Sequence, residues 1–284
     1  MIIEQKEIKY RGKVIFGKIV MSSDFKRIPK LFSEDEACFL VLSKGAFQFR
    51  TPTNVLTFNE GDAMLAKCGN YFIEEVTVAQ NYSPETISTI GAYFHPSIVK
   101  EFFQSDLSLQ DFQTKFDVTK VSIEPLMKLY LDSINFLLDN PSLVDENLII
   151  NKLKELLLLL SKSEKAESIH AFVNSLFVPY EYDFNEIIQH NLYSNLTLEE
   201  LARLCNLSLA TFKRKFTELH KESPAKYILS KKLERAASLL TIKSKPVSDI
   251  AYECGFETVT SFNKAFKHHF EKSPSEYRLS RIDN

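Results

Sequence analysis

Short stretches of alternating apolar and polar residues fill the first 95 residues of the chain, and this period of two is typical of strands with one buried face. β-Branched and aromatic residues are common in these stretches, and turn-forming residues such as Gly45, Asn59 and Asn70 separate them. The predicted strands are 13–20, 36–43, 46–51, 54–59, 62–67, 71–78 and 86–94. Strands this short and closely spaced predict a β-sandwich or barrel.

A helical period begins after Pro96, where apolar residues recur every three or four positions. We therefore predict that 96–176 form a helical linker. One helix, within 145–162, carries an apolar seam of 4-3-4 spacing formed by Ile149, Leu153, Leu156 and Leu160. Such a seam more often packs into the core of its own chain. Leucines at 157–159 widen it, so a homodimer contact is the second interpretation.

The last part of the chain, 177–284, repeats itself. Ser-Pro-x-x-Tyr occurs at 223–227 and again 50 residues later, at 273–277. Upstream of the two copies, 201–216 and 250–266 share an Ala-x-x-Cys step and a Phe-x-x-x-Phe ending. So many coincidences indicate that one helical unit has been duplicated.

Each copy has the pattern of two short helices joined by a tight turn. In the first copy, Thr197 and Glu200 form a capping box, and Ser208 can cap the second helix. In the second copy, Ser248 is the predicted cap and Gly255 lies in the turn. The two predicted helix-turn-helix units are 197–220 and 247–270.

The second helix of each unit has an aromatic face and a polar, basic face. The aromatic faces are formed by Leu209, Phe212, Phe216 and Leu219, and by Phe262, Phe266 and Phe270. The outer faces hold Ala210, Lys213, Arg214 and Thr217, and Thr260, Asn263, Lys264 and Lys267. A buried anchor with long donors outside suits a helix that contacts bases in the major groove. A solvated amphipathic helix explains either copy alone, but the duplication favours double-stranded DNA as the partner.

The segment between the units, 224–242, begins with proline and contains no glycine, so it is predicted to be one helix of roughly 28 Å. Major-groove segments on one face of B-DNA recur about every 34 Å. Such a helix can hold two recognition helices in neighbouring turns of the groove. The candidate phosphate contacts are Lys231, Lys232, Arg235, Lys243, Lys245 and Lys267.

Charge is distributed unevenly along the chain. The formal net charge is -2, yet the part from Arg203 onward holds 16 Lys and Arg against 9 Asp and Glu. The preceding 202 residues carry a net charge of -9. A basic region of this size favours a nucleic-acid partner, although solvated surfaces have the same composition.

Other compositional features exclude several classes of protein. The four cysteines, Cys38, Cys68, Cys205 and Cys254, lack the spacing of zinc ligands, so small buried side chains are expected. The N-terminal residues lack the apolar stretch of a signal peptide, and no apolar run is long enough to span a bilayer. We therefore expect a cytoplasmic protein without membrane association.

Residues 182–281 resemble the DNA-binding domain of the AraC/XylS family of bacterial transcription regulators. The resemblance rests on both Ser-Pro-x-x-Tyr motifs, the long linker helix, and Ile-Ala-x-x-x-Gly-Phe at 250–256. It implies a regulator, most often an activator, that recruits RNA polymerase. The base-contacting positions that it implies are Ala210, Lys213, Arg214, Val259, Thr260, Asn263 and Lys264. Lys221 and Glu271 stand where the family usually has a left-handed glycine, so we expect strain of about 1 kcal/mol or a different helix end.

Many members of this family carry a cupin-like β-barrel in front, which implies the same for the strand-rich start of this chain. One stretch resembles the second cupin motif, with Gly61 and Gly69 in place but Lys67 and Phe72 where the motif has proline and histidine. Cupin enzymes hold iron or manganese with several histidines, and His95 is the first of only six in this chain. We therefore expect no catalytic residue, no metal site and no cofactor.

The sequence thus predicts an α+β multidomain protein: a cupin-like sensing domain at 1–95, a helical linker and dimerisation region at 96–176, and an all-α double helix-turn-helix domain at 177–284. A small-molecule effector would bind inside the barrel, where the candidate lining residues are Phe39, Phe47, Phe49 and Phe72. Ordinary core packing also explains these four. A protein partner that controls the same DNA-binding activity is the first alternative, and a non-metal cupin enzyme with a helical module is the second.

Overall fold

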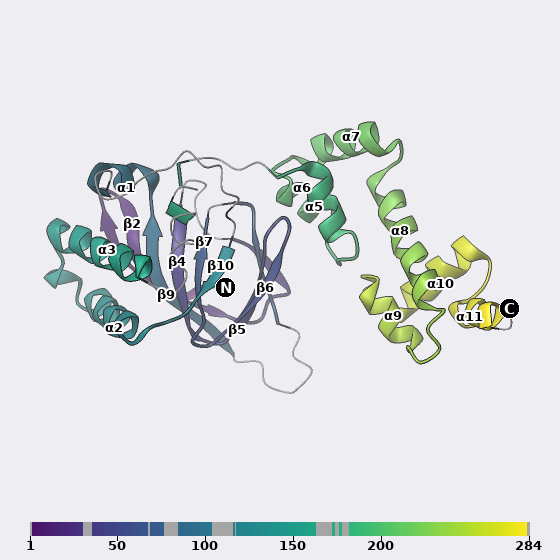
Figure 1. Ribbon diagram of the computed structural model, residues 1–284, viewed down its shortest axis with the longest axis horizontal. Helices are drawn as coiled ribbons and strands as arrows, with labels where there is room; N and C mark the ends of the chain where they lie inside the picture. The colour runs from purple at the N-terminus through teal and green to yellow at the C-terminus, as the bar shows by residue number, and fades with distance from the viewer. Residues whose placement is uncertain are drawn as a thin grey trace. The chain divides into compact units, whose positions relative to one another are not determined.

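The computed structural model describes residues 2–30, 36–67, 69–76, 85–103, 116, 118–162, 172–173, 176–177 and 182–282. The chain divides into two compact units, Met1–Glu181 and Tyr182–Asn284. The described strands all lie in the first unit, and the second unit is helical (Figure 1). The predicted α+β multidomain class is confirmed. The finer division of the first unit at residue 95 stays a prediction.

Six antiparallel strands form the larger sheet of the N-terminal unit, in the order β1-β2-β9-β4-β7-β10. These strands are β1 Ile2–Tyr10, β2 Lys13–Ser22, β9 Thr86–Phe94, β4 Ala37–Lys44, β7 Ala63–Ala66 and β10 Val118–Val121. Two of them, β1 and β10, were not predicted. Strand β10 lies in the region predicted to be helical, and it pairs with β7 through the register Val118 to Ala66. Because this partner is distant in sequence, the local pattern around β10 gives no sign of the pairing.

Four strands form the smaller sheet, in the order β3-β8-β5-β6. They are β3 Arg27–Pro29, β8 Phe72–Glu74, β5 Ala46–Arg50 and β6 Val55–Asn59. Side chains from both sheets share one apolar core, which includes Ile19, Leu40 and Met64 from the larger sheet and Phe47 and Phe49 from the smaller one. Among the described residues the two hydrogen-bonded sheets stay separate. The arrangement is therefore a two-sheet sandwich, one of the two predicted alternatives, and the cupin-like barrel that the resemblance implied is not closed among these residues.

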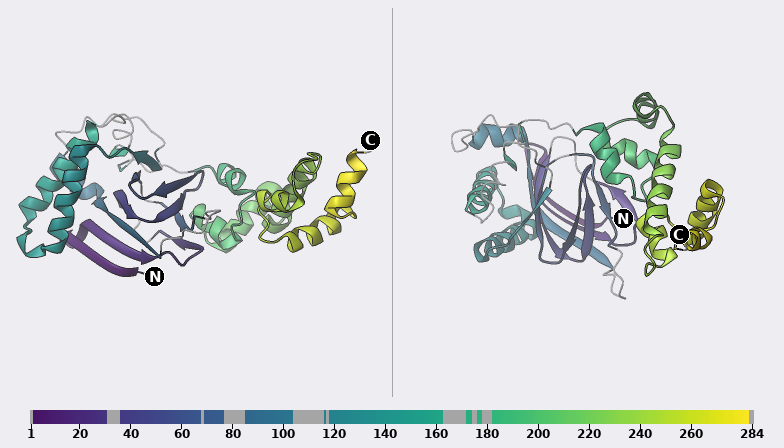
Figure 2. Two further views of the ribbon diagram at one scale, coloured as in Figure 1. Left: turned by 90° about the horizontal axis from the view of Figure 1, so that it is seen from below. Right: turned by 45° about the vertical axis from the view of Figure 1, so that its right-hand side comes forward.

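Helices cover the other face of the larger sheet (Figures 1 and 2). They are α1 Pro96–Phe103, α2 Pro125–Asp139 and α3 Glu146–Ser161, with the short 3-10 helix η1 Pro141–Leu143 between α2 and α3. The predicted seam residues of α3 are buried within this layer: Ile149 is 5% exposed, and Leu153, Leu156 and Leu160 are 0% exposed. The dimer interpretation of this seam is therefore wrong, because the seam is filled by the core of its own chain.

Helix α2 is apolar on more than its buried side. Its inner face packs into the core through residues such as Tyr130 and Ile134. Its outer side exposes Leu126, Leu129 and Phe136, which are 63%, 66% and 57% exposed. We call these three residues the α2 outer stripe.

Seven described helices build the C-terminal unit. They are α5 Phe184–Asn191, α6 Leu198–Leu204, α7 Leu209–His220, α8 Pro224–Leu239, α9 Val247–Glu253, α10 Val259–Phe270 and α11 Pro274–Ile282. The unit has two apolar cores, one around Phe212 and Phe216 and the other around Phe262 and Phe266. Helix α8 contributes Tyr227 to the first core and Leu233 to the second, so it joins the two halves. Within the described part of the chain, no helix has the length and apolar character that crossing a membrane requires.

Candidate DNA-binding surface

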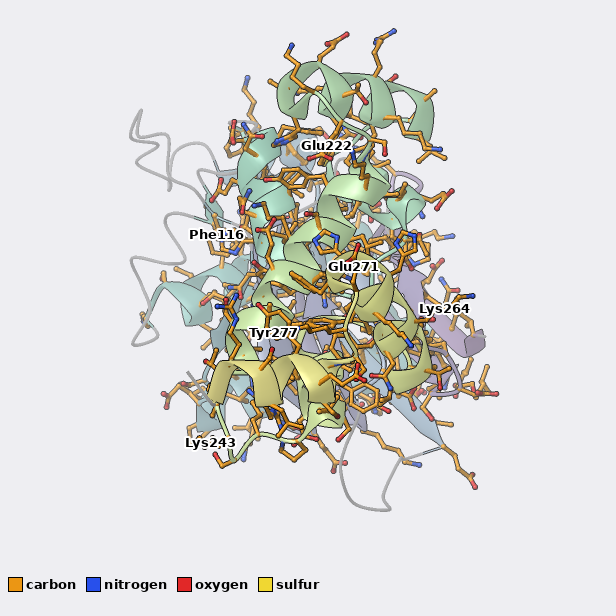
Figure 3. The ribbon with its side chains drawn as sticks, turned by 90° about the vertical axis from the view of Figure 1, so that its right-hand side faces the viewer. Phe116, Glu222, Lys243, Lys264, Glu271 and Tyr277 are labelled. Atoms are coloured by element: carbon orange, nitrogen blue, oxygen red, sulfur yellow. The ribbon has the colours of Figure 1, made fainter. Side chains whose placement is uncertain are left out.

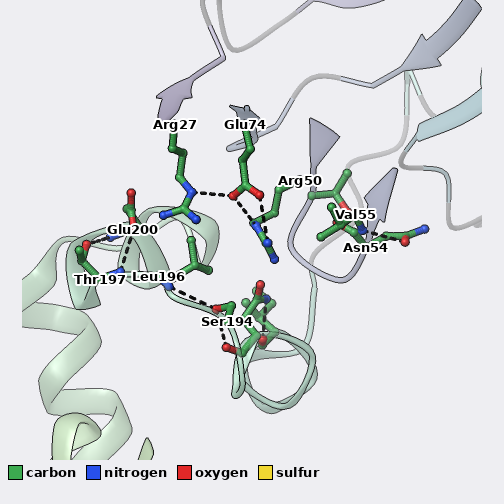
Figure 4. A network of polar contacts seen from close by, with 12 residues as sticks. Arg27, Arg50, Asn54, Val55, Glu74, Ser194, Leu196, Thr197 and Glu200 are labelled. Carbon is green, nitrogen blue, oxygen red and sulfur yellow. Dashed lines mark hydrogen bonds and ion pairs between the residues drawn. The ribbon is translucent and has the colours of Figure 1, made fainter. Parts of the chain in front are cut away.

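Helices α6 and α7 form the first helix-turn-helix unit, and side chains cap the start of both. The Thr197 N–H donates to Glu200 Oε2 at 2.8 Å, and the Glu200 N–H donates to the Thr197 hydroxyl at 3.2 Å (Figure 4). At the start of α7, the Thr211 N–H donates to the Ser208 hydroxyl at 3.2 Å. The predicted capping box and the predicted cap at Ser208 are confirmed. Both caps satisfy N–H groups that have no partner within the helix.

Helices α9 and α10 form the second unit, and its turn has the same backbone geometry as the first. Asn206 in the first turn and Gly255 in the second have positive φ angles of 54° and 78°. In each turn the next residue donates its N–H to an alanine carbonyl five positions earlier, at 2.9 Å to Ala202 and 3.0 Å to Ala251. The duplication found in the sequence is thus a duplication of backbone structure.

The caps of the second unit differ from the prediction. Helix α9 begins at Val247 after Pro246, so Ser248 lies inside its first turn, where it donates to Asp249 at 3.1 Å. The predicted cap at Ser248 is therefore wrong. Thr258 caps α10 by accepting a hydrogen bond from the Ser261 N–H at 3.1 Å.

The recognition helices α7 and α10 bury the central phenylalanines of their aromatic faces and expose their polar faces, while Leu219 at the end of α7 is 50% exposed. Phe212, Phe216, Phe262 and Phe266 are 0% exposed. The predicted base-facing residues that are exposed are Ala210, Lys213, Arg214, Thr217, Thr260, Asn263 and Lys264. Val259 is only partly exposed, because it packs against the second core. Figure 3 shows Lys264 on the outer side of α10.

Two of the predicted phosphate contacts, Lys267 and Lys243, are exposed at the surface of the C-terminal unit, and Figure 3 labels Lys243. Lys231 lies on α8 and forms an ion pair with Glu234 at 2.8 Å, one turn further along the helix. An exposed pair of this kind exchanges easily with water and phosphate. These three lysines remain candidates for phosphate contact.

The remaining cations of this set are engaged inside the unit. Lys245 and Arg235 both pair with Glu253, and they lower the pKa of its carboxyl. Lys232 donates to two backbone carbonyls, and burial lowers the pKa of its ammonium. We therefore withdraw Lys232 from the phosphate contacts, since its donors point into the unit. Helical spacing alone places it beside Lys231 and does not distinguish the two.

Both recognition helices end in a strained conformation. Lys221 after α7 and Glu271 after α10 have φ angles of 61° and 59°, in the left-handed region that glycine prefers. The Lys221 N–H donates to the Thr217 carbonyl at 2.9 Å. Of the two expectations for these positions, the strained helix end is confirmed.

His220, which the sequence analysis did not single out, lies in an aromatic cluster at the end of α7. Its ring centre is 4.3 Å from that of Phe216 and 4.6 Å from that of Tyr227. Its Nε2 atom is buried and has no hydrogen-bond partner among the described residues. In the second unit Phe270 takes the same place, 4.6 Å from Phe266. The 50-residue offset of the repeat aligns His220 with Phe270, and this was the signal available in the sequence.

The core of the N-terminal unit contains a small apolar cavity between its two sheets. Among the residues that line it are Ile19, Met21, Leu40, Phe47, Met64 and Ile73. The cavity is little larger than a water molecule. Of the four predicted effector-binding phenylalanines, only Phe47 lines it. Phe39 lies on the helix-covered face of the larger sheet, Phe49 belongs to the same core as Phe47, and Phe72 is buried on β8, so none of these three lines this cavity.

A buried carboxylate joins three strands of the smaller sheet (Figure 4). Glu74 on β8 accepts hydrogen bonds from the Nε atoms of Arg27 on β3, at 2.5 Å, and Arg50 on β5, at 2.6 Å. The Glu74 side chain is 7% exposed. Such a network fixes strand order because removing one partner leaves a buried charge without compensation.

Comparisons with known proteins agree with this architecture. Residues 37–172 match the ExsA N-terminal regulatory domain, and residues 201–280 match a helix-turn-helix domain. The chain is 22% identical over 261 residues to the virulence regulon transcriptional activator VirF of Yersinia enterocolitica, covering 89% of this chain and 93% of VirF. It is 32% identical over 95 residues to the TetD protein of transposon Tn10 from Escherichia coli, covering 34% of this chain and 69% of TetD. An AraC-type regulator structure from Chromobacterium violaceum is 31% identical, with a TM-score of 0.28, covering 30% of this chain and 77% of that one.

Two capped helix-turn-helix units with exposed basic helices, preceded by a regulatory domain, define a DNA-binding transcription regulator. The chain belongs to the AraC/XylS family of transcription regulators. Two of the relatives named above, VirF and the Chromobacterium violaceum protein, are regulators of transcription, as their names state.

Proposed function

We propose that α7 and α10 enter neighbouring segments of the major groove of one DNA duplex. We also propose that the protein acts in the cytoplasm. The observation that carries the DNA-binding proposal is the left-handed residue and the matching backbone hydrogen bond that both turns share, together with the exposed polar faces of α7 and α10. Arg214 and Lys213 on α7 have the long donors that suit guanine, and Asn263 on α10 has the amide that suits adenine. Ala210, Thr217, Val259, Thr260 and Lys264 complete the base-facing set. Lys231, Lys243 and Lys267 are the proposed phosphate contacts, with Arg235 and Lys245 near them.

We infer that the protein activates transcription by bringing RNA polymerase to its binding sites. The name of its relative VirF, a transcriptional activator that aligns over most of both chains, supports this role. This role does not require the protein to make or break covalent bonds, so we propose that it is not an enzyme. The cupin-enzyme hypothesis has no observation in its favour.

We propose that the active form is a homodimer joined through the α2 outer stripe. Leu126, Leu129 and Phe136 lie on one side of a helix at the surface of the N-terminal unit, and apolar side chains this exposed favour association. The α3 seam, which was predicted for this role, is filled by the protomer core. An isologous contact between two α2 helices would bury the stripe of each copy.

The N-terminal unit is proposed to control DNA binding through its surface. The cavity between the two sheets, as the described residues line it, leaves little room for a buried effector. This observation favours the hypothesis of a protein partner over that of a small molecule. A partner that covers the α2 outer stripe would compete with dimerisation.

Selection of bound sequences from a random duplex pool by the full-length protein tests the DNA-binding mode. We expect a motif with two blocks about one helical turn apart. Arg214→Ala should relax the preference at one position of one block, because a bidentate base contact is lost, at a cost of about 1–3 kcal/mol. The control Lys243→Ala removes an exposed cation outside the recognition helices and should weaken all sequences alike. A single block in the wild-type motif would contradict binding by both helices.

A further inference from the structure

Lys232 of α8 contacts both halves of the C-terminal unit. Its ammonium donates to the Ser194 carbonyl at 2.6 Å and to the Gly255 carbonyl at 2.9 Å. Ser194 lies between α5 and α6 of the first half, and Gly255 lies in the turn between α9 and α10 of the second half. The side chain is partly buried. One cation thus ties a loop of each half to the helix that separates them.

The two halves also meet directly through their backbones at this point. A Cβ atom on Gly255 would lie 2.2 Å from the Tyr193 carbonyl oxygen and 2.8 Å from that of Ser194. Such distances are too short for any side chain, so the turn of the second unit lies against the 193–194 segment of the first half. Gly255 also has a φ of 78°, which disfavours other residues.

Arg235, almost one turn further along α8, makes a second bridge. Its guanidinium carbon lies 4.2 Å from the ring centre of Tyr193, in the first half. Its Nη2 atom is 3.3 Å from the carboxylate of Glu253, the last residue of α9 in the second half. Two cations from one side of α8 therefore hold the same two segments together. We call this cluster the inter-unit joint; it consists of Tyr193, Ser194, Lys232, Arg235, Glu253 and Gly255.

We propose that Lys232 is a positioning residue that fixes the relative orientation of the two recognition helices, and thereby the DNA spacing that the protein accepts. Helix α8 by itself sets the distance between the two halves. It does not prevent each half from tilting about its own contact with the helix. The inter-unit joint opposes this tilt because its contacts link the first half to the second half beside α8. The inference rests on the proposed function, in which both helices bind one duplex.

The test measures spacing selectivity with the full-length protein. The probes are duplexes that carry the selected two-block motif with its original spacer, or with one base pair added or removed. Lys232→Met keeps a similar side-chain length but leaves two carbonyls without their donor. We expect wild type to lose at least about tenfold in affinity when the spacer changes, and Lys232→Met to lose less than about threefold. Binding of the variant to the original spacer should weaken by about fivefold to tenfold.

The controls separate positioning from general effects of charge and folding. Lys231→Met removes the neighbouring exposed cation, so it should weaken all probes alike and keep the wild-type selectivity. Lys232→Arg keeps the donors and should restore selectivity in part. Arg235→Met breaks the second bridge and tests the joint independently if Lys232→Met does not fold, which circular dichroism would reveal. It should also reduce selectivity.

The possible failures are distinguishable. If wild type depends on the spacer and the Lys232 and Arg235 variants depend on it equally, the joint does not set the spacing and this inference is overturned. If wild type binds the duplexes without any dependence on the spacer, the proposal of two helices on one duplex falls as well. Selectivity that is lost in Lys231→Met as much as in Lys232→Met would assign the effect to charge and also overturn the inference.

Discussion

Lys221 and Glu271 occupy left-handed positions at the ends of the two recognition helices. Each substitution to glycine should raise the free energy of unfolding by about 1 kcal/mol, because glycine has no Cβ to clash in this conformation. Chemical denaturation of Lys221→Gly and Glu271→Gly measures the effect. Affinity for DNA should stay unchanged, since the backbone already has the required shape.

Alanine at the same positions provides the control for this expectation. Lys221→Ala and Glu271→Ala keep a Cβ and should gain no stability. If the glycine variants are no more stable than the alanine variants, the left-handed helix ends are not strained.

At the residue scale, the sequence predicted positions that depend on helical period and failed for those that depend on distant partners. The buried phenylalanines and the exposed Arg214 follow from periodicity alone. Lys232 does not, because its carbonyl partners are 38 and 23 residues away in the sequence. Ser248 was wrong for a local reason, since α9 begins earlier than its capping pattern indicates. Periodicity predicts the direction of a side chain but not the residues that it contacts.

At the scale of the element, the aromatic clusters that close the two units differ by one ring. His220 in the first unit takes the place of Phe270 in the second, and its buried Nε2 has no partner among the described residues. His220→Phe should therefore stabilise the protein by about 1 kcal/mol, because burial of a polar atom without a hydrogen bond is unfavourable. The rise in Tm in a thermal unfolding experiment measures this.

The duplicated unit supplies a matched control. Phe270→His places the same ring in the second cluster and should lower stability by a similar amount, at neutral pH. A loss of stability in His220→Phe would mean that the His220 ring has a favourable polar contact after all.

Helices and strands were predicted well where one hydrophobic period continues along the element. They were predicted poorly where pairing with a distant strand determines the structure. The helices of the C-terminal unit and the longer strands β2, β4 and β9 have clear local patterns. Strand β10 is short and becomes a strand through its ladder with β7. Strand spacing predicted either a sandwich or a barrel, because it does not determine how sheets close. Hydrogen bonding among the described strands gives two sheets instead.

At the scale of the whole molecule, the proposed dimer contact at the α2 outer stripe would connect regulation to DNA binding. A dimer carries four recognition helices, so it binds paired sites with a higher effective concentration than a monomer does. The stripe belongs to the unit that matches a regulatory domain, and the recognition helices belong to the other. If the protein dimerises through α2, binding of a partner to the surface of the N-terminal unit would change the occupancy of DNA by the C-terminal unit. This coupling needs no cavity and no buried effector.

A single charge in the stripe tests this arrangement. Leu129 is 66% exposed, so Leu129→Asp should leave the fold intact while it desolvates a carboxylate in any α2 contact. We expect wild type to sediment as a dimer at micromolar concentrations and Leu129→Asp to sediment as a monomer, with about tenfold weaker binding to paired sites. Lys128→Asp introduces the same side chain at the adjacent exposed position, outside the stripe, and should stay dimeric. If wild type and Leu129→Asp sediment equally, as monomers or as dimers, the α2 outer stripe is not a dimer contact. If Leu129→Asp and Lys128→Asp lose dimerisation equally, the effect comes from the added negative charge and not from the loss of an apolar contact.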